Sequence, residues 1–238
     1  YGRHEFPAEN GLSPFVQLLH ALNGVAGLER IRFTSPHPTG LKDDLIAAYA
    51  ELPKLCEHMH LPVQSGSNRI LKAMRRSYSR ELFLRKIDAL RKARPDIALC
   101  TDIIVGFPGE SEQDFLDTCS LVEAVRFDNA FVFRYSDRRG TASADMAGQL
   151  SEDVKQDRNQ RLLDIVNRIA REILASVVGT VQEVLVEGPS KTNADRLMGR
   201  TRHNRIAVFE GDDALRGCLQ RLTITRSSNH TLYGEPLP

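Results

Sequence analysis

The sequence predicts an α/β protein in which part of a parallel β/α barrel precedes a small all-β barrel. Two observations predict the first part: short apolar runs alternate with helical periodicity, and polar or glycine-rich turns follow two of those runs. A third predicts the second part, because near Gly179 the pattern changes to short β-type runs. We therefore expect two domains, residues 1–177 and 178–238.

Length and composition agree with this organisation. With 238 residues, of which 41% are hydrophobic, the chain can form one or two domains with real cores. The net charge of +1 does not by itself indicate nucleic acid. No run reaches the roughly eighteen apolar residues of a membrane span, and no signal peptide is visible, so we expect a cytoplasmic protein with no membrane partner. The opening YGRHEF lacks methionine and resembles a loop after a strand, so we expect a missing upstream part.

The N-terminal part alternates helices with short strands. Apolar residues recur at helical spacing in the helices, and Pro14 is tolerated in the first turn of the first one. Each strand is a short apolar run that stops at prolines or small polar residues. In order, we expect a helix over 10–23, a strand over 31–34, a helix over 41–55, a strand over 61–63, a helix from Asn68 and a helix over 79–93.

The same layout returns in the next part of the chain. Residues 102–105 form an apolar run of the kind buried on both faces of a parallel sheet. Ser111 and Asp114 have the spacing of a capping box, which predicts the start of a helix. These elements bring the total to four strand–helix units after an incomplete first one, which favours a partly closed barrel. They are strands over 102–105 and 130–135 and helices over 112–125 and 151–177.

Beyond Gly179 the chain has the pattern of a small β-barrel. Leu222 and Ile224 alternate with polar residues, as in a strand with one buried face. A barrel of this size is similar to those that bind oligonucleotides. The expected β segments are 181–188, 197–211, 218–226 and 231–236.

The cysteines do not predict a metal site. They are Cys56, Cys100, Cys119 and Cys218. Their separations of 44, 19 and 99 residues match no zinc or iron–sulfur spacing, so we expect reduced, mostly buried thiols. His58 and His60 flank Met59 and could touch a metal, although such residues are more often structural.

Two turns are candidates for a ligand site. Gln64, Ser65 and Ser67 follow the 61–63 strand and can donate and accept hydrogen bonds, which suits a ribose or a carboxylate. Turn chemistry with a helix N-cap explains them equally well. Gly106 and Gly109 would let the backbone approach a flat ligand, but such a loop alone is a weak signal.

Four motifs in order carry a resemblance to a known family. They are HLPVQSGSNRILKAMRRSY, TDIIVGFPGESEQDF, RFDNAFVFRYSDRRGTASADM, and VEGPSK followed by GRTRHNRIAVFEG. The chain resembles the methylthiotransferases of the radical S-adenosylmethionine (radical SAM) superfamily, closest to the branch that acts on isopentenylated tRNA. The resemblance implies a partial radical SAM barrel over 1–177 and a TRAM RNA-binding barrel over 178–238. It also implies that the N-terminal cluster domain and part of the barrel are not in this chain.

The resemblance implies an activity, cofactors and partners. The activity would add a methylthio group to C2 of N6-isopentenyladenosine beside the anticodon of tRNA. It would use S-adenosyl-L-methionine, two [4Fe–4S] clusters, a sulfur donor and an electron donor such as flavodoxin or ferredoxin. The cluster motif CxxxCxxC is absent from this sequence, so we expect this chain alone to be inactive.

Three alternatives stay open. A sibling enzyme would methylthiolate threonylcarbamoyl-adenosine in tRNA or an aspartate of a ribosomal protein. The chain could instead be an RNA-binding module without catalysis. It could also be an ordinary metabolic β/α barrel with a β appendage.

Site residues follow from the resemblance and from charge. The resemblance assigns S-adenosylmethionine binding to Gln64, Ser65, Ser67, Ile104, Val105, Gly106 and Phe133. It assigns no catalytic residue, and residues 136–143 lack both prolines of the family's SPRPGTPA. We expect RNA contacts from Lys191, Arg200, Arg202, Asn204 and Arg205, with a solvated strand face as the alternative. We expect Arg75, Arg76, Arg80 and Arg91 on ordinary solvent-facing helix surfaces.

Overall fold

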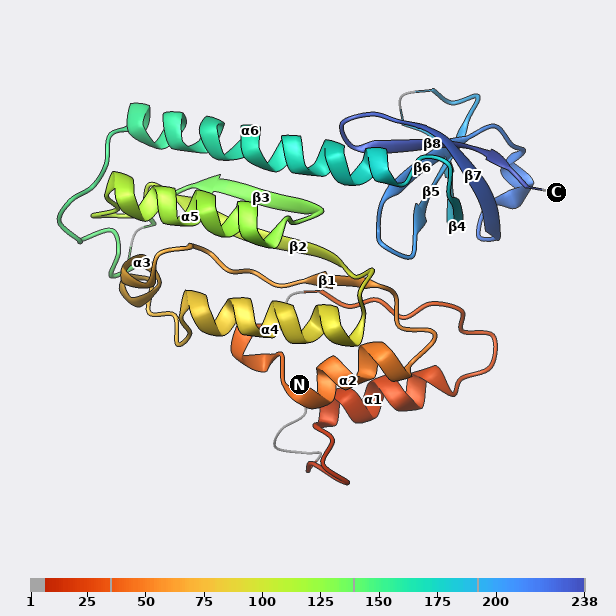
Figure 1. Ribbon diagram of the computed structural model, residues 1–238, viewed down its shortest axis with the longest axis horizontal. Coiled ribbons are helices and arrows are strands. Elements are labelled where there is room, and N and C mark those ends of the chain that lie inside the picture. The colour runs from red at the N-terminus through yellow and green to blue at the C-terminus, as the bar shows by residue number, and fades with distance from the viewer. Residues whose placement is uncertain (1–6, 35, 139, 192, 238) are drawn as a thin grey trace. The chain divides into compact units, whose positions relative to one another are not determined.

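The computed structural model describes residues 7–34, 36–138, 140–191 and 193–237 (Figure 1). The chain divides into two compact units, Tyr1–Val166 and Asn167–Pro238. The division falls inside the long helix α6 (Glu152–Ser176), whose predicted extent of 151–177 is confirmed. The predicted loop at residues 1–6 lies outside the described residues.

The N-terminal unit contains a parallel sheet with the strand order β1-β2-β3. In its register, His58 pairs with Ala98 and Cys100 pairs with Asn129. This parallel α/β arrangement confirms the predicted fold class. The elements before α6 are α1 (Pro14–Asn23), the 3-10 helix η1 (Pro38–Gly40), α2 (Asp43–Glu51), β1 (His58–His60), α3 (Asn68–Ala73), α4 (Arg80–Ala93), β2 (Ala98–Val105), α5 (Glu112–Val125) and β3 (Asn129–Arg134).

Two predicted strands are wrong in extent. The run 31–34 contributes a single parallel bridge, between Ile31 and Leu55, and the described residues of this sheet form three strands, one fewer than the four units predicted. The strand predicted at 61–63 begins earlier, at His58, and its regular pairing stops before Pro62, which has no N–H to donate.

The side chain of Thr101 makes the hydrogen bonds that regular strand pairing lacks beside Pro62. Its hydroxyl accepts from the Val63 amide at 3.0 Å and donates to the Leu61 carbonyl at 2.8 Å. Backbone pairing resumes at Gln64, whose amide donates to the Asp102 carbonyl at 2.8 Å. The chain therefore stays against β2 up to Gln64, and the polar turn begins at that point.

Capping residues set the helix limits. Ser79 caps α4 by accepting from the Leu82 amide, and Ser111 forms the predicted capping box with Asp114 at the start of α5. The predicted helix over 41–55 is shorter, because Leu52 precedes Pro53 and is therefore disfavoured from helical conformation. Likewise α1 begins only at Pro14, which occupies its first turn.

The C-terminal unit is a small closed β-barrel, as predicted. Its described residues form five strands, because the predicted segment 197–211 is divided into two. Its strand order is β4-β5-β6-β8-β7, with one parallel pair between β6 and β8. Leu222 and Ile224 are fully buried inside it, which confirms the alternation read from the sequence. The strands are β4 (Val181–Pro189), β5 (Leu197–Thr201), β6 (Ile206–Phe209), β7 (Leu219–Ser227) and β8 (Thr231–Pro236), with the 3-10 helix η2 (Asp213–Leu215) before β7.

The four cysteines are free thiols with different exposure. Cys56 and Cys100 are buried, Cys119 is half-buried and Cys218 is exposed. Free thiols were predicted, while burial holds for only part of the set. Over the described part of the chain, no helix has the length and apolarity needed to cross a membrane.

These environments predict a strong order of thiol reactivity. Burial raises the pKa of Cys100 to about 12 and that of Cys119 to about 11. We expect iodoacetamide at pH 8 to label Cys218 at least on the order of a hundredfold faster than Cys100, because only thiolates react. Peptide mass spectrometry over a time course measures this, and labelling in urea provides the control in which all four react. Equal rates for Cys100 and Cys218 in the folded protein would contradict the burial described here.

Candidate functional site

One cavity in the N-terminal unit brings together part of the predicted ligand site. Its volume is about 940 Å³, within the range of sites that hold a small organic ligand. Gln64, Ile104 and Phe133 line it, together with the segment after α3 and the loop after β3. The cavity lies at the carboxyl ends of parallel strands, which is where open α/β sheets bind ligands.

Strand alternation decides which side chains reach the cavity. Asp102 and Ile104 lie on the cavity side of β2, whereas Ile103 is fully buried on the opposite face. On β3, Phe133 stands beside Ile104 in the register, and 53% of its surface is exposed. The two side chains form an apolar wall. The prediction that this run is buried on both faces is therefore wrong for the cavity face.

Gln64 is held in an unusual backbone conformation at the edge of the cavity. Its φ of 70° is left-handed, which is uncommon for a residue with a side chain. Its amide donates to the Asp102 carbonyl, and its carbonyl accepts from the Ile104 amide at 2.9 Å. These two bonds fix the backbone, so the side-chain amide is presented to the cavity from a rigid position.

Tyr135 is a cavity residue that the sequence analysis did not single out. It is buried, and its hydroxyl has no hydrogen-bond partner among the residues that the structure describes. Its ring packs edge-to-face against Phe107 at 5.2 Å, and the Lys155 ammonium lies 5.6 Å from the ring centroid. A buried hydroxyl without a partner in the wall of a cavity is suited to bind a polar ligand atom.

His60 and Asp102 form a pair next to this wall. The Nε2 atom of His60 lies 2.9 Å from an Asp102 carboxylate oxygen, and its ring stands edge-on to Phe131 at 6.2 Å. Within the described residues, no three histidine, cysteine or acidic side chains form a group able to hold a metal. The pair therefore positions Asp102 at the cavity, in agreement with a structural role for His60.

Ser65 and Ser67 do not line this cavity, and their contact with S-adenosylmethionine stays a prediction. Both are buried and bonded to α5: the Ser65 hydroxyl is 3.3 Å from the Thr118 hydroxyl, and the Ser67 hydroxyl donates to Asp114 at 2.6 Å. Ser67 also accepts from the Ile70 amide as the N-cap of α3. Turn chemistry, the alternative left open by the sequence, accounts for both residues.

Val105 and Gly106 do not line the cavity either. Val105 is fully buried on the other face of β2. Gly106 has a φ of +75°, and its amide already donates to the Glu110 carboxylate at 2.8 Å. A Cβ at this position would lie 2.5 Å from Cγ of Lys155. The positive φ and the close approach of Lys155 account for the glycine, and its predicted contact with a ligand stays a prediction.

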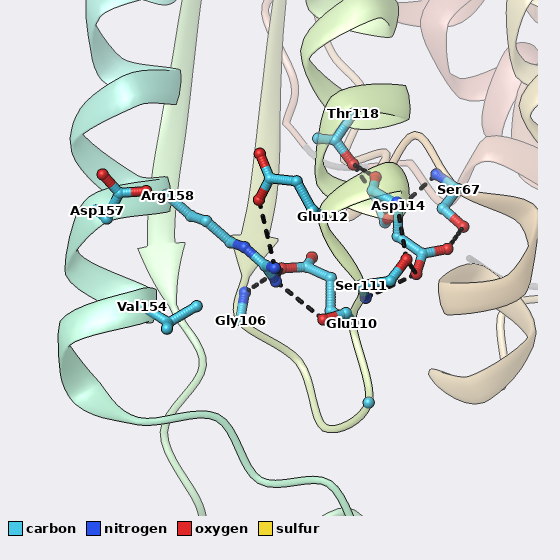
Figure 2. A network of polar contacts seen from close by, with 12 residues as sticks. Ser67, Gly106, Glu110, Ser111, Glu112, Asp114, Thr118, Val154, Asp157 and Arg158 are labelled. Carbon is cyan, nitrogen blue, oxygen red and sulfur yellow. Dashed lines mark hydrogen bonds and ion pairs between the residues drawn. The ribbon is translucent and has the colours of Figure 1, made fainter.

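A buried polar network joins the turns that follow β1 and β2 to helices α5 and α6 (Figure 2). Arg158 of α6 binds the Glu110 carboxylate at 2.7 Å, and both side chains are almost completely buried. Burial raises the pKa of Glu110, although the Gly106 amide and Arg158 favour its charged form. The sequence analysis missed this pair, because the two residues are far apart in the chain and each alone resembles a surface charge.

Asp114 is the second centre of that network. Its carboxylate accepts from Ser67 and from the Ser111 amide (Figure 2). It also accepts from Arg69, and so joins α3 to α5. Burial opposes ionisation, but hydrogen bonds from Arg69, Ser111 and Ser67 outweigh it and hold the pKa of Asp114 well below its usual range. The capping box was predicted from the sequence; the contacts with Ser67 and Arg69 were not.

A side chain at Gly66, in the turn after β1, is expected to clash with the backbone of α5. A Cβ on Gly66 would lie 2.5 Å from the Thr118 Cα and 2.6 Å from the Asp117 carbonyl oxygen, both backbone atoms of α5. We expect Gly66→Ala to lower the free energy of unfolding by about 2 kcal/mol, since α5 must shift. Urea denaturation followed by circular dichroism measures this change. Gly40→Ala is the matched control, because its Cβ meets nothing within 4 Å, and an equal loss in both variants would refute the clash.

The predicted RNA residues lie in the C-terminal unit, and the structure brings four of them together. Arg200 is on β5, while Arg202, Asn204 and Arg205 belong to the turn that joins β5 to β6. Lys191 is exposed on a different connection, between β4 and β5. Arg200 is engaged internally, with its Nε 3.2 Å from the Glu187 carboxylate and its Nη1 donating to the Asn204 side chain at 3.2 Å.

The four arginines predicted on solvent-facing helix surfaces have different environments. Arg80 donates to the Asp117 carbonyl and the Ser120 hydroxyl, and Arg91 donates to the Val125 carbonyl, so both connect α4 to α5. Arg75 and Arg76 line the cavity. The predicted solvent-facing position holds for Arg75, which is exposed. It is wrong for Arg80 and Arg91, because sequence periodicity does not reveal which carbonyls lie beside a helix.

Comparison with known families agrees with both units. The Radical SAM superfamily matches residues 9–122, and the TRAM domain family matches residues 175–237. Among solved structures, the chain is similar to coproporphyrinogen III oxidase (HemN) from Escherichia coli, with 13% identity and a TM-score of 0.49 over 71% of this chain and 45% of that one.

The curated proteins to which this chain is similar share one name. A tRNA-2-methylthio-N(6)-dimethylallyladenosine synthase from Methylacidiphilum infernorum is 57% identical over 100% of this chain and 51% of its own length. Proteins of the same name from Opitutus terrae and Akkermansia muciniphila are 54% and 53% identical, over 99% and 100% of this chain and 49% and 52% of their own lengths. The chain thus spans about half the length of the curated relatives it matches. Residues 9–122 therefore match a radical SAM domain and residues 175–237 a TRAM domain, and the resemblance found in the sequence motifs is confirmed.

Proposed function

We propose that this protein is a tRNA methylthiotransferase that adds a methylthio group to C2 of N6-isopentenyladenosine beside the anticodon. The observation that carries the proposal is the 57% identity to a tRNA-2-methylthio-N(6)-dimethylallyladenosine synthase over the whole chain. The cavity at the strand ends supplies a place for the chemistry. We propose residues 1–177 as the barrel part and 178–238 as the RNA-binding part.

The cavity residues fit S-adenosylmethionine. Ile104 and Phe133 offer apolar surface to an adenine, and the Gln64 amide and the unpartnered Tyr135 hydroxyl offer polar contacts to a ribose or an amino acid group. Together with a reduced iron–sulfur cluster, the bound cofactor would supply radical chemistry. In the proposal, the wall of β2 and β3 orients the cofactor and keeps water away from it.

The residues of this chain do not fit an iron–sulfur cluster. Its sequence contains no CxxxCxxC, and the described residues hold no group of three or more metal-binding side chains. We derive no step through a cluster from this chain. The two clusters, an electron donor such as flavodoxin or ferredoxin, a sulfur donor and a cytoplasmic location belong to the proposal for the whole protein.

The RNA contacts of the C-terminal unit are also proposed. Arg202 and Arg205 lie in the β5–β6 turn and stay partly exposed, so they are placed to contact phosphates. Lys191, Arg200 and Asn204 would contribute from the same unit. Each phosphate contact should add about 0.7 to the salt slope of binding to a single-stranded RNA loop.

Mass spectrometry of tRNA nucleosides tests the proposed function. The complete gene is expressed in a bacterium that makes N6-isopentenyladenosine but has lost its own methylthiotransferase. We expect 2-methylthio-N6-isopentenyladenosine to reappear, while the empty vector restores nothing. Methylthio groups found instead on threonylcarbamoyl-adenosine or on a ribosomal protein would assign the sibling substrate. Unchanged nucleosides and proteins would overturn the proposed activity.

A further inference from the structure

Two adjacent arginines and a third that is distant in sequence line the cavity. Arg75 and Arg76 follow α3, and Arg138 lies in the loop after β3. Arg75 has a left-handed backbone with a φ of 56°, so the chain turns at this point as it leaves α3. The side chains of Arg75 and Arg138 are exposed and that of Arg76 is half-buried. We call these three residues the arginine rim.

The charge of the arginine rim is not neutralised by the described part of the protein. Among the described residues, Asp102 is the one carboxylate that lines the cavity, and it is already paired with His60 at 2.9 Å. The fourth lining arginine, Arg134, differs, because it binds Gln156 at 2.9 Å and lies 3.8 Å from Glu152. The described residues form no comparable ion pair with the rim. The cavity therefore carries unpaired positive charge.

The other side chains that line the cavity indicate which class of anion the arginine rim would bind. Ile104, Phe133 and Tyr135 provide apolar and aromatic surface beside the rim. Basic side chains next to aromatic faces are the combination that single-stranded nucleic acids require, since phosphates and bases are bound together. Arginine forms two parallel hydrogen bonds with a phosphate. One carboxylate could occupy a single arginine, whereas three arginines on two segments suit consecutive phosphates.

We propose that Arg75, Arg76 and Arg138 bind backbone phosphates of the RNA on either side of the nucleotide that enters the cavity. This inference rests on the proposed function and adds a second RNA-contact surface, in the N-terminal unit. The rim positions the substrate at the site of reaction and takes no part in the chemistry itself.

The salt dependence of RNA binding tests the proposal. The complete gene product is titrated with a fluorescent anticodon stem-loop containing N6-isopentenyladenosine, at 50 to 200 mM salt. Arg75→Ala/Arg138→Ala should reduce the slope of log K against log salt by about 1.4, two contacts of about 0.7 each. Over that fourfold range of salt, the variant then loses about sevenfold less affinity than the wild type.

Matched variants separate this effect from a general loss of charge. Lys42→Ala/Arg85→Ala removes two exposed positive charges outside the cavity and should leave the slope unchanged. Arg75→Lys/Arg138→Lys keeps both charges and should keep the slope. Arg202→Ala/Arg205→Ala should also lower the salt slope. The reductions from the arginine rim and from the C-terminal unit should be additive.

Two results would overturn the rim as an RNA surface. An unchanged slope in Arg75→Ala/Arg138→Ala is the first. The second is a loss of S-adenosylmethionine binding, measured by equilibrium dialysis, with RNA binding intact, which would assign the rim to the cofactor carboxylate. The proposed function is judged separately: salt-sensitive binding at the rim without any methylthio product in cells would refute the activity and leave the rim in place.

Discussion

Replacing Asp114 by alanine is expected to lower the free energy of unfolding by about 3 to 4 kcal/mol at pH 7. The carboxylate is buried, and its loss would leave the Ser67 hydroxyl without its acceptor and Arg69 with the Gly109 carbonyl alone. The start of α5 would also lose half of its capping box. Loss of a helix cap alone costs about 1 kcal/mol. Urea denaturation followed by circular dichroism measures the total.

The effect of Asp114 should depend on pH in a defined direction. Its pKa is lowered in the folded protein, so its contribution is complete above the ordinary pKa of an aspartate and is lost as the pH falls through the lowered value. The difference between wild type and Asp114→Ala should therefore shrink below about pH 4. Asp153→Ala is the control, an exposed acid in the first turn of α6. A loss for Asp114→Ala no larger than that of the control would contradict the network.

Replacing Glu110 by alanine should lower the free energy of unfolding by a similar amount, about 3 kcal/mol. The buried Arg158 cation would lose its buried partner and keep only the exposed Glu112 carboxylate, 3.6 Å away. The Gly106 amide would also lose its acceptor at the turn beside the cavity. Urea denaturation again provides the measurement. The exposed pair of Asp88 and Lys92 gives the comparison, and Asp88→Ala should cost no more than about 0.5 kcal/mol.

A double variant distinguishes a stranded charge from a lost contact. Glu110→Met/Arg158→Met removes both charges and fills a similar volume, so it should recover much of the stability lost in Glu110→Ala. A double variant as unstable as the single one would show that the hydrogen bonds to the Glu110 backbone and the Gly106 amide matter more than the charge.

Local signals in the sequence were enough for much of the fold. Ser79, Ser111 and Asp114 marked helix starts that the structure confirms, and Leu222 with Ile224 marked a strand buried on one face. These features depend on residues within a few positions of each other, so a single sequence contains them. The strand over 61–63 was misplaced, because the Thr101 side chain that completes its pairing comes from another strand.

The candidate site could be predicted only in part, because its contacts also involve residues from distant segments of the chain. Gln64, Ile104 and Phe133 reach the cavity, whereas Ser65 and Ser67 turn to α5. A polar residue at a strand end can face a ligand or a neighbouring helix with equal local geometry. Which of the two occurs depends on the positions of Thr118 and Asp114 in space. The sequence around Ser65 does not contain this information.

The sequence by itself determined the two-part organisation, the superfamily and the strand ends at which a ligand site would form. Periodicity, caps and ordered motifs are local or linear properties, so they can be read without coordinates. Only the tertiary structure decided that Glu110 meets Arg158 and that Arg75, Arg76 and Arg138 share a cavity. Charge and hydrogen-bond partners are settled by distance in space, and folding brings together residues whose separation along the chain does not predict it.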